Sequence, residues 1–147
     1  MHEKVLPESS LALLEGLGRL KSPALSGWTL AGGTGLALHL GHRVSDDFDF
    51  FRKDRFDVPR IHAAFRQQGP YETLQEAEDM LTVLSGGTKL SFFAIPDPFI
   101  YPAAPYRFFA LADVRDIALM KLVAISGRGS RKDFVDLFFI LRGGMSL

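Results

Sequence analysis

Two carboxylates two residues apart, Asp47 and Asp49, follow a glycine pair, Gly32-Gly33, and the adjacent Thr34. Closely spaced carboxylates can bind Mg²⁺ and leave coordination positions for phosphate oxygens and water. A glycine turn between a strand and a helix directs backbone N–H groups at an anion, and the helix dipole favours negative charge there. Together these residue types predict a metal-dependent nucleotide site.

The carboxylate pair also has a purely structural explanation. Residues 47–51 are predicted to form a strand, and alternate side chains of a strand share a face. Asp47 and Asp49 would then point the same way, about 6.6 Å apart along the strand, while the intervening phenylalanines enter the core. A half-exposed strand with acids on its wet side would show the same pattern. Asp46 makes three acids in four residues, which favours a bound cation.

The glycine turn differs from the two best-known phosphate loops. No Gly-Lys-Ser/Thr follows it, so it is not a P-loop. Gly32-Gly33-Thr34-Gly35 also lacks the G-x-G-x-x-G spacing of dinucleotide-binding folds. Thr34 would add a hydroxyl donor to a bound phosphate. A tight connection between a strand and a helix would equally need these glycines.

The composition predicts one folded domain, residues 1–147. Nearly half of the 147 residues are hydrophobic and 13 are Phe, which excludes a disordered chain. The formal net charge is zero and there is no cysteine, so a global attraction to nucleic acid and thiolate metal sites are both excluded. The charged N-terminus does not resemble a signal peptide, and no apolar run approaches the ~20 residues that span a bilayer. We therefore expect a cytoplasmic protein.

Hydrophobic periodicity and turn residues predict a mixed α/β (α+β) fold, with a β-sheet flanked by helices. The predicted elements are a helix at 8–20, a strand at 27–31, a helix capped by Thr34 and ended by Gly41, a strand at 47–51, a helix at 58–68, a hairpin of strands 80–84 and 89–95, a proline-rich loop at 96–107, and helices at 113–126 and 131–142. These elements would place the glycine turn between a strand and a helix, and the carboxylates on the second strand.

The sequence resembles the AbiEii/AbiGii toxin family of nucleotidyltransferases, which belongs to the polymerase-β-like superfamily. The segments that carry the resemblance are Gly32-Gly33-Thr34-Gly35-Leu36-Ala37-Leu38, His42-Arg43-Val44-Ser45-Asp46-Asp47-Phe48-Asp49-Phe50-Phe51, Asp116-Ile117-Ala118-Leu119-Met120-Lys121-Leu122-Val123-Ala124-Ile125, and Arg128-Gly129-Ser130-Arg131-Lys132-Asp133-Phe134-Val135-Asp136-Leu137. They extend over most of the chain and keep the family's order of motifs.

The resemblance implies a nucleotidyltransferase-like fold and a role for each motif. The implied metal ligands are Asp47 and Asp49, which would bind Mg²⁺. The implied catalytic residues are Asp47, Asp49, Lys121, Asp133 and Asp136. The implied nucleotide-binding residues are Gly32, Gly33, Thr34, Ser45, Lys121, Arg128 and Lys132.

The implied reaction moves a nucleotide from a nucleoside triphosphate to an acceptor, RNA/tRNA or protein, and releases pyrophosphate. The resemblance also implies the toxin of a bacterial toxin–antitoxin pair linked to abortive infection, with a cognate antitoxin as partner. Many polymerase-β-like enzymes carry a third acid on a later strand, where this chain has Ser91. The alternative is therefore a catalytically weak or inactive module that binds a nucleotide or a partner.

The C-terminal motif also has structural explanations. Ser130 and Asp133 have the spacing of a capping box, and acids are favoured in a first helical turn. A lone Lys121 in an apolar helix commonly extends its amine to solvent. His39 and His42 lie three residues apart near the predicted site, where they could serve a phosphate, but exposed surface positions are the simpler expectation.

Overall fold

The computed structural model describes residues 1–143, apart from the side chain of Arg128. The elements in chain order are 3₁₀ helix η1 (Glu3–Val5), α1 (Glu8–Leu20), 3₁₀ helix η2 (Pro23–Leu25), β1 (Thr29–Ala31), α2 (Gly32–Leu40), β2 (Asp47–Arg52), α3 (Val58–Gln68), β3 (Glu72–Ala77), β4 (Met80–Ser85), β5 (Thr88–Ala94), β6 (Ala104–Tyr106), β7 (Phe109–Leu111), α4 (Val114–Arg128) and α5 (Arg131–Arg142). The predicted mixed α/β architecture is confirmed.

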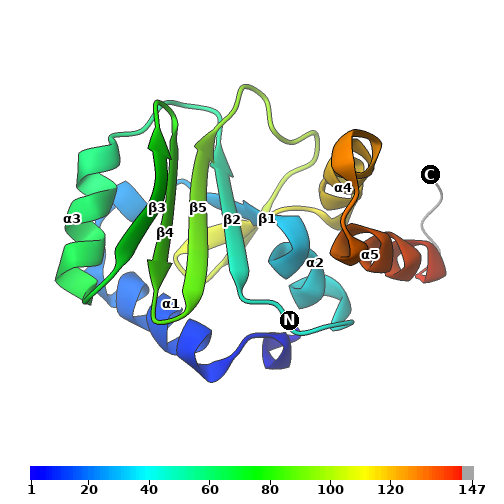
Figure 1. The fold of residues 1–147 in the computed structure, drawn as a ribbon, viewed down its shortest axis with the longest axis horizontal. Coiled ribbons are helices and arrows are strands. Elements are labelled where there is room, and N and C mark those ends of the chain that lie inside the picture. The colour runs from blue at the N-terminus through cyan, green and yellow to red at the C-terminus, as the bar shows by residue number, and fades with distance from the viewer. Residues whose placement is uncertain (144–147) are drawn as a thin grey trace.

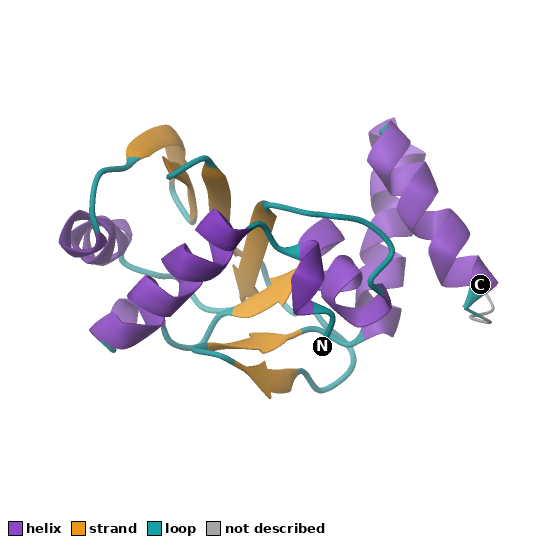
Figure 2. Ribbon diagram, turned by 90° about the horizontal axis from the view of Figure 1, so that it is seen from below, coloured by secondary structure: helices purple, strands orange, loops and turns teal. Residues whose placement is uncertain are grey.

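The strands form one mixed sheet with the order β3-β4-β5-β2-β1-β7-β6. β2 runs parallel to β5 and antiparallel to β1, so it lies at the centre with a partner on each side. β1 is also parallel to β7. Figures 1 and 2 show α1 and α3 at one end of the molecule and the α4–α5 pair at the other end. β2 therefore lies between α1 and α3 on one side and the α4–α5 pair on the other.

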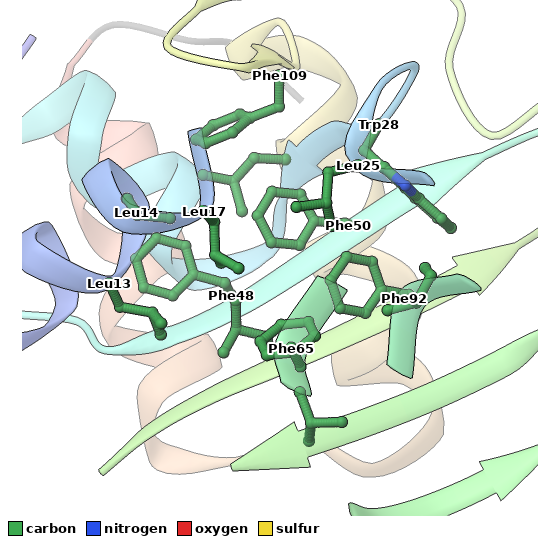
Figure 3. Close-up of a cluster of buried hydrophobic side chains, with 14 of the residues drawn as sticks. Leu13, Leu14, Leu17, Leu25, Trp28, Phe48, Phe50, Phe65, Phe92 and Phe109 are labelled. Carbon is green, nitrogen blue, oxygen red and sulfur yellow. The ribbon is translucent and has the colours of Figure 1, made fainter. Parts of the chain in front are cut away.

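The alternation along β2 divides its side chains between two faces. Phe48 and Phe50 are buried in the larger core cluster together with apolar residues of α1 and α3. The ring of Phe50 stacks on that of Phe92 at a centroid distance of 5.2 Å and meets Phe109 edge-on at 5.1 Å. Figure 3 shows these rings gathered near Leu17 of α1. Asp47 and Asp49 consequently belong to the opposite face, as the sequence predicted.

A smaller apolar cluster holds the second helical layer. Leu36 of α2, Ile117 of α4 and Ile140 of α5 are buried in it together with Phe51 of β2. In α5 the buried residues are Asp136 and Ile140, so this helix contributes little apolar surface to the core. None of the helices in residues 1–143 is long and apolar enough to cross a membrane.

Several predicted elements match the structure. The helices at 8–20, 58–68 and 131–142 have the predicted bounds, and the hairpin of β4 and β5 turns at Gly86 and Gly87. Asp113 caps α4 by accepting a hydrogen bond from the backbone N–H of Arg115.

Two expectations about the elements were wrong or incomplete. α2 begins at Gly32, directly after β1, and Thr34 lies inside its first turn instead of capping it. A φ of +66° at Gly32, which glycine adopts readily, lets the chain pass from strand to helix without a loop. The expected loop at 96–107 ends in β6, an edge strand that tolerates Pro105 because one side needs no partner.

The edge strand β3 and the short strand β7 were not predicted. Every residue of β3 is exposed, so its sequence has no apolar alternation, and its pairing with β4 supplies the structure. β7 is three residues long and is defined by its pairs with β1 and β6.

We predict that Phe50→Ala lowers the free energy of unfolding by about 3–5 kcal/mol, because it empties a site where aromatic rings meet. Urea unfolding followed by circular dichroism measures the change. Phe138→Ala removes the same ring from a residue that is 56% exposed, and it should change stability little. Equal losses in the two variants would contradict the assignment of Phe50 to the core.

Candidate nucleotide and metal site

The centre of the site is Asp49, in the middle of β2. Its neighbours across the sheet are Ala31 of β1 and Ser91 of β5. Asp47 lies one pleat earlier on the same face, opposite Lys89 of β5. Ser91, where a third acid was considered, is thus in direct register with Asp49, but its hydroxyl is hydrogen-bonded to that of Thr82 at 2.9 Å.

The two carboxylates repel each other in a partly buried place. Burial and the neighbouring charge of Asp47 raise the pKa of Asp49 from 3.8 to about 6, although Lys89 and Lys121 act in the opposite direction. The negative charge at this point is therefore incompletely balanced by the protein. A cation bound between the two carboxylates would lower this pKa, because it would favour the ionised form.

The glycine turn is packed between two charged side chains. A Cβ at Gly32 would lie 2.5 Å from Oδ2 of Asp49, so that carboxylate is in contact with the turn. A Cβ at Gly33 would collide with Nη2 of Arg43 and lie 3.5 Å from Oδ2 of Asp136. Gly32 is required by both its φ and its neighbour, whereas Gly33 is required by space alone.

Thr34 and Ser45 hold the turn to the carboxylate strand from inside. Thr34 is fully buried, and its hydroxyl donates to the backbone oxygen of Asp47. The same hydroxyl is hydrogen-bonded to that of Ser45 at 2.6 Å. Both residues were predicted to bind nucleotide. In this structure their hydroxyls bond within the protein, and they fix the N-terminal turn of α2 against the start of β2.

The buried carboxylate of Asp136 joins three basic side chains. Nε and Nη2 of Arg43 donate to its two oxygens at 2.8 and 3.0 Å. His42 Nε2 lies 2.6 Å from Oδ1, and Lys121 Nζ lies 2.8 Å from Oδ2. Burial alone would raise the pKa of Asp136, but hydrogen bonds from these three side chains lower it to about 2. Both oxygens are therefore occupied by protein donors.

Lys121 connects this cluster to the start of α5. Its amine also donates to Oδ1 of Asp133 at 2.8 Å. The predicted capping box is present, because Ser130 and Asp133 exchange hydrogen bonds across the N-terminus of α5. Desolvation opposes ionisation of Asp133, but the bonds from Lys121 and Ser130 dominate and lower its pKa. Lys121 is largely buried, so it does not extend to solvent.

Lys132 is the residue of α5 that approaches the carboxylate strand. Its Nζ lies 4.0 Å from Oδ2 of Asp47, and its side chain is 67% exposed. The structure thus gathers most of the predicted site residues around the glycine turn. The side chain of Arg128 lies outside the described part of the structure.

Arg43 was not predicted as a site residue and His42 was expected at the surface, yet both bond to Asp136. The expectation that the histidines are exposed was wrong for His42. Its side chain is 1% exposed and packs against the ring of Phe139. Nδ1 of His42 has no hydrogen-bond partner among the described residues. His39 is also partly buried, with Nε2 2.8 Å from the backbone oxygen of Ala112. A His-Arg pair just before a run of acids is the signal that could have pointed to them.

The metal-binding potential of the site rests on two carboxylates. No group of three or more His, Asp or Glu side chains within the described residues is arranged to hold a metal ion. Asp133 and Asp136, predicted to complete the site, bond to Lys121 and Arg43 instead. Among the described residues, Asp47 and Asp49 form no hydrogen bond to a basic side chain: Lys132 Nζ lies 4.0 Å from Oδ2 of Asp47, and Asp49 is in contact with the glycine turn.

Comparison with known protein families gives a match in the first part of the chain. A family model described as the nucleotidyl transferase AbiEii toxin of a type IV toxin–antitoxin system matches residues 17–81. The match contains the glycine turn and both aspartates of β2. The predicted resemblance to the AbiEii family is therefore confirmed over this part of the chain.

A relative matches a longer part of the chain than that segment. A protein of Aquifex aeolicus (strain VF5), described as "Uncharacterized protein aq_aa25", is 41% identical over 117 residues, which are 77% of this chain and 57% of that protein. The chain thus spans a little over half the length of this relative.

Two solved structures share the fold at low sequence identity. The Megavirus polyadenylate synthase has a TM-score of 0.63 at 12% identity, over 90% of this chain and 31% of that one. The antibiotic-resistance factor ANT(2'')-Ia has a TM-score of 0.63 at 13% identity, over 90% of this chain and 83% of that one. The nucleotidyltransferase-like fold predicted from the resemblance is therefore confirmed.

We predict that Asp49→Asn stabilises the metal-free protein at neutral pH. The folded protein binds the Asp49 proton more tightly than the unfolded chain, so wild-type stability falls as the pH rises from 3.8 to about 6. The gain from Asn should grow across that interval and reach up to about 3 kcal/mol above it. Urea unfolding in EDTA at several pH values measures it.

Asp46→Asn is the matched control, because Asp46 is an exposed acid next to the same strand. Its effect on stability should be small. A stability difference between Asp49→Asn and wild type that does not change with pH would contradict the raised pKa of Asp49.

Proposed function

We propose that this protein is a Mg²⁺-dependent nucleotidyltransferase. It moves a nucleotide from a nucleoside triphosphate to a hydroxyl of an acceptor, RNA/tRNA or protein. The acceptor hydroxyl loses its proton to solvent as its oxygen forms a bond to the α-phosphorus, the bond between the α-phosphorus and the oxygen of the β-phosphate breaks, and pyrophosphate leaves. The observation that carries the proposal is the contact between the glycine turn and Asp49, because a turn at a helix start can bind phosphate and a carboxylate can bind a metal ion.

The donor set fits the metal. Mg²⁺ is bound in many phosphoryl-transfer sites by one or two carboxylates together with substrate phosphates and water. Asp47 and Asp49 share a face, and the raised pKa of Asp49 marks negative charge that lacks a partner. These two residues would hold the ion. A bound ion would neutralise part of the negative charge of the phosphates.

The chain's own residues would bind and orient the triphosphate. No side chain caps the N-terminus of α2, so the first N–H groups of this helix are available to phosphate oxygens. Lys132 is mostly exposed and is loosely placed near Asp47, so it can turn toward a phosphate. Thr34 and Ser45 act indirectly, because their hydroxyls keep the turn in register with β2.

The biological role that fits this activity is that of a toxin. The matched family is described as the toxin of a type IV toxin–antitoxin system. We extend that description to this chain: a cytoplasmic protein with a cognate antitoxin, acting in abortive infection. The acceptor and the nucleotide would determine how it is toxic.

The test of activity is label transfer. Purified protein, Mg²⁺, each labelled nucleoside triphosphate, total bacterial RNA and a cell extract should give labelled RNA or labelled protein. Asp47→Ala/Asp49→Ala should reduce the transfer by at least about 1000-fold, because it removes both carboxylates that would hold the metal. Gel electrophoresis of the products measures the transfer.

The matched control is Asp46→Ala/Asp54→Ala, which removes two acids that flank the same strand and are exposed. It should leave label transfer near the wild-type level. The proposal fails if wild type labels no more product than the Asp47/Asp49 double variant.

One observation favours a second candidate function, a nucleotide-binding or partner-binding module with little or no catalysis. Ser91 occupies the position on β5 next to Asp49, and it bonds to Thr82 instead of offering a carboxylate. A serine hydroxyl is a weak Mg²⁺ ligand compared with a carboxylate. This module would bind a nucleoside triphosphate and release it unchanged.

Ser91→Asp separates the two functions. A third carboxylate beside Asp49 should raise the affinity for Mg²⁺ about tenfold or more, and it should lower the melting temperature in EDTA through added repulsion. Isothermal calorimetry and thermal unfolding measure these effects. Label transfer that appears only in Ser91→Asp identifies the wild type as the binding module, whereas strong transfer by wild type identifies an enzyme.

A further inference from the structure

Arg43 is held in one orientation by a buried carboxylate. Two of its nitrogens, Nε and Nη2, bond to both oxygens of Asp136, which is fully buried. Its third nitrogen, Nη1, has a long contact of 3.4 Å to the backbone oxygen of Val44. A guanidinium fixed in this way loses little freedom when it binds a ligand, and it retains donors on Nη1.

The guanidinium of Arg43 lies directly against the glycine turn. Nη2 occupies the space that a Cβ at Gly33 would need. Gly33 is the second residue of α2, whose N-terminus has no side-chain cap. A fixed cation and uncapped helix N–H groups therefore meet at one point, and both favour an anion.

Asp136 holds a second cation on the same side. Lys121 Nζ bonds to Oδ2, the oxygen that also accepts from Nη2 of Arg43. His42 bonds to the other oxygen and packs against Phe139. Each oxygen of this carboxylate has two basic nitrogens at hydrogen-bonding distance. The carboxylate therefore serves to position these basic side chains.

We propose that Arg43 is a phosphate-binding residue for the triphosphate and that Asp136 is the positioning residue that holds Arg43 and Lys121 beside the glycine turn. This inference rests on the proposed function for the identity of the substrate. It assigns Asp136 a role through its basic partners, and it adds Arg43 to the residues that contact nucleotide. The ligand chemistry recognised is a polyphosphate chain.

The experiment measures binding of inorganic tripolyphosphate in Mg²⁺ by isothermal calorimetry. Arg43→Met should weaken binding about 10- to 100-fold, because it removes charge-assisted hydrogen bonds to phosphate. Arg43→Lys should lie between Met and wild type, since it keeps the charge without the planar fork. Arg60→Met, at a 74% exposed arginine paired with Asp57, is the control and should bind as wild type does.

A double-mutant cycle tests the positioning role. Asp136→Asn should weaken tripolyphosphate binding by a similar or larger factor, but its effect should be smaller in the Arg43→Met background, where Lys121 is the remaining cation that it positions. Circular dichroism checks that each variant is folded. If Asp136→Asn does not fold, the tripolyphosphate affinities of wild type, Arg43→Lys and Arg43→Met decide whether Arg43 binds phosphate.

The outcomes separate this inference from the proposed function. Wild-type affinity in Arg43→Met, or no tripolyphosphate binding by wild type, overturns the inference. Independent losses from Asp136→Asn and Arg43→Met that simply multiply overturn the positioning role. Tripolyphosphate binding that depends on Arg43 without any label transfer would support the inference and refute the proposed enzyme, and label transfer with unchanged binding in Arg43→Met would do the reverse.

Discussion

The ion cluster around Asp136 joins α5 to α4 and to the segment before β2. α5 buries few apolar residues, so its attachment depends on this carboxylate among Arg43, His42 and Lys121 as well as on Ile140. These partners come from the segment before β2 and from α4. Removing one partner of a buried ion pair leaves an uncompensated charge and costs about 3–5 kcal/mol. The same contacts bring Lys132 within 4.0 Å of Asp47, so the geometry of the site depends on this cluster.

The two positions of the turn require glycine for different physical reasons. Gly32 adopts a φ of +66° and leaves room for the carboxylate of Asp49, so it determines how the metal side of the site approaches the helix. Gly33 leaves room for the guanidinium of Arg43, which can therefore lie close to the start of the helix. A single helix start thus lies between a carboxylate and a guanidinium. This arrangement explains why a glycine pair is needed without any bound phosphate.

The sequence predicted those parts of the fold that depend on local periodicity. Apolar spacing identified α1, α3 and α5 to the residue, and the alternation in β2 correctly placed the two aspartates on the face opposite Phe48. β3 was missed because an exposed edge strand has no apolar alternation. The bond between Arg43 and Asp136 joins residues 93 positions apart, and no local pattern encodes such a contact. The roles assigned to the site residues stay predictions, although the structure gathers most of their side chains.

The charge balance of the carboxylate face distinguishes it from the Asp136 cluster. Asp136 has a pKa lowered to about 2, because its basic partners exceed the effect of burial, whereas Asp49 has a pKa raised to about 6 in the same protein. Lys89 and Lys121 offset the repulsion at Asp49 only in part. A fold that required Asp49 for stability alone would gain by replacing it with a neutral residue. The acid therefore makes physical sense if a cation binds beside it during function.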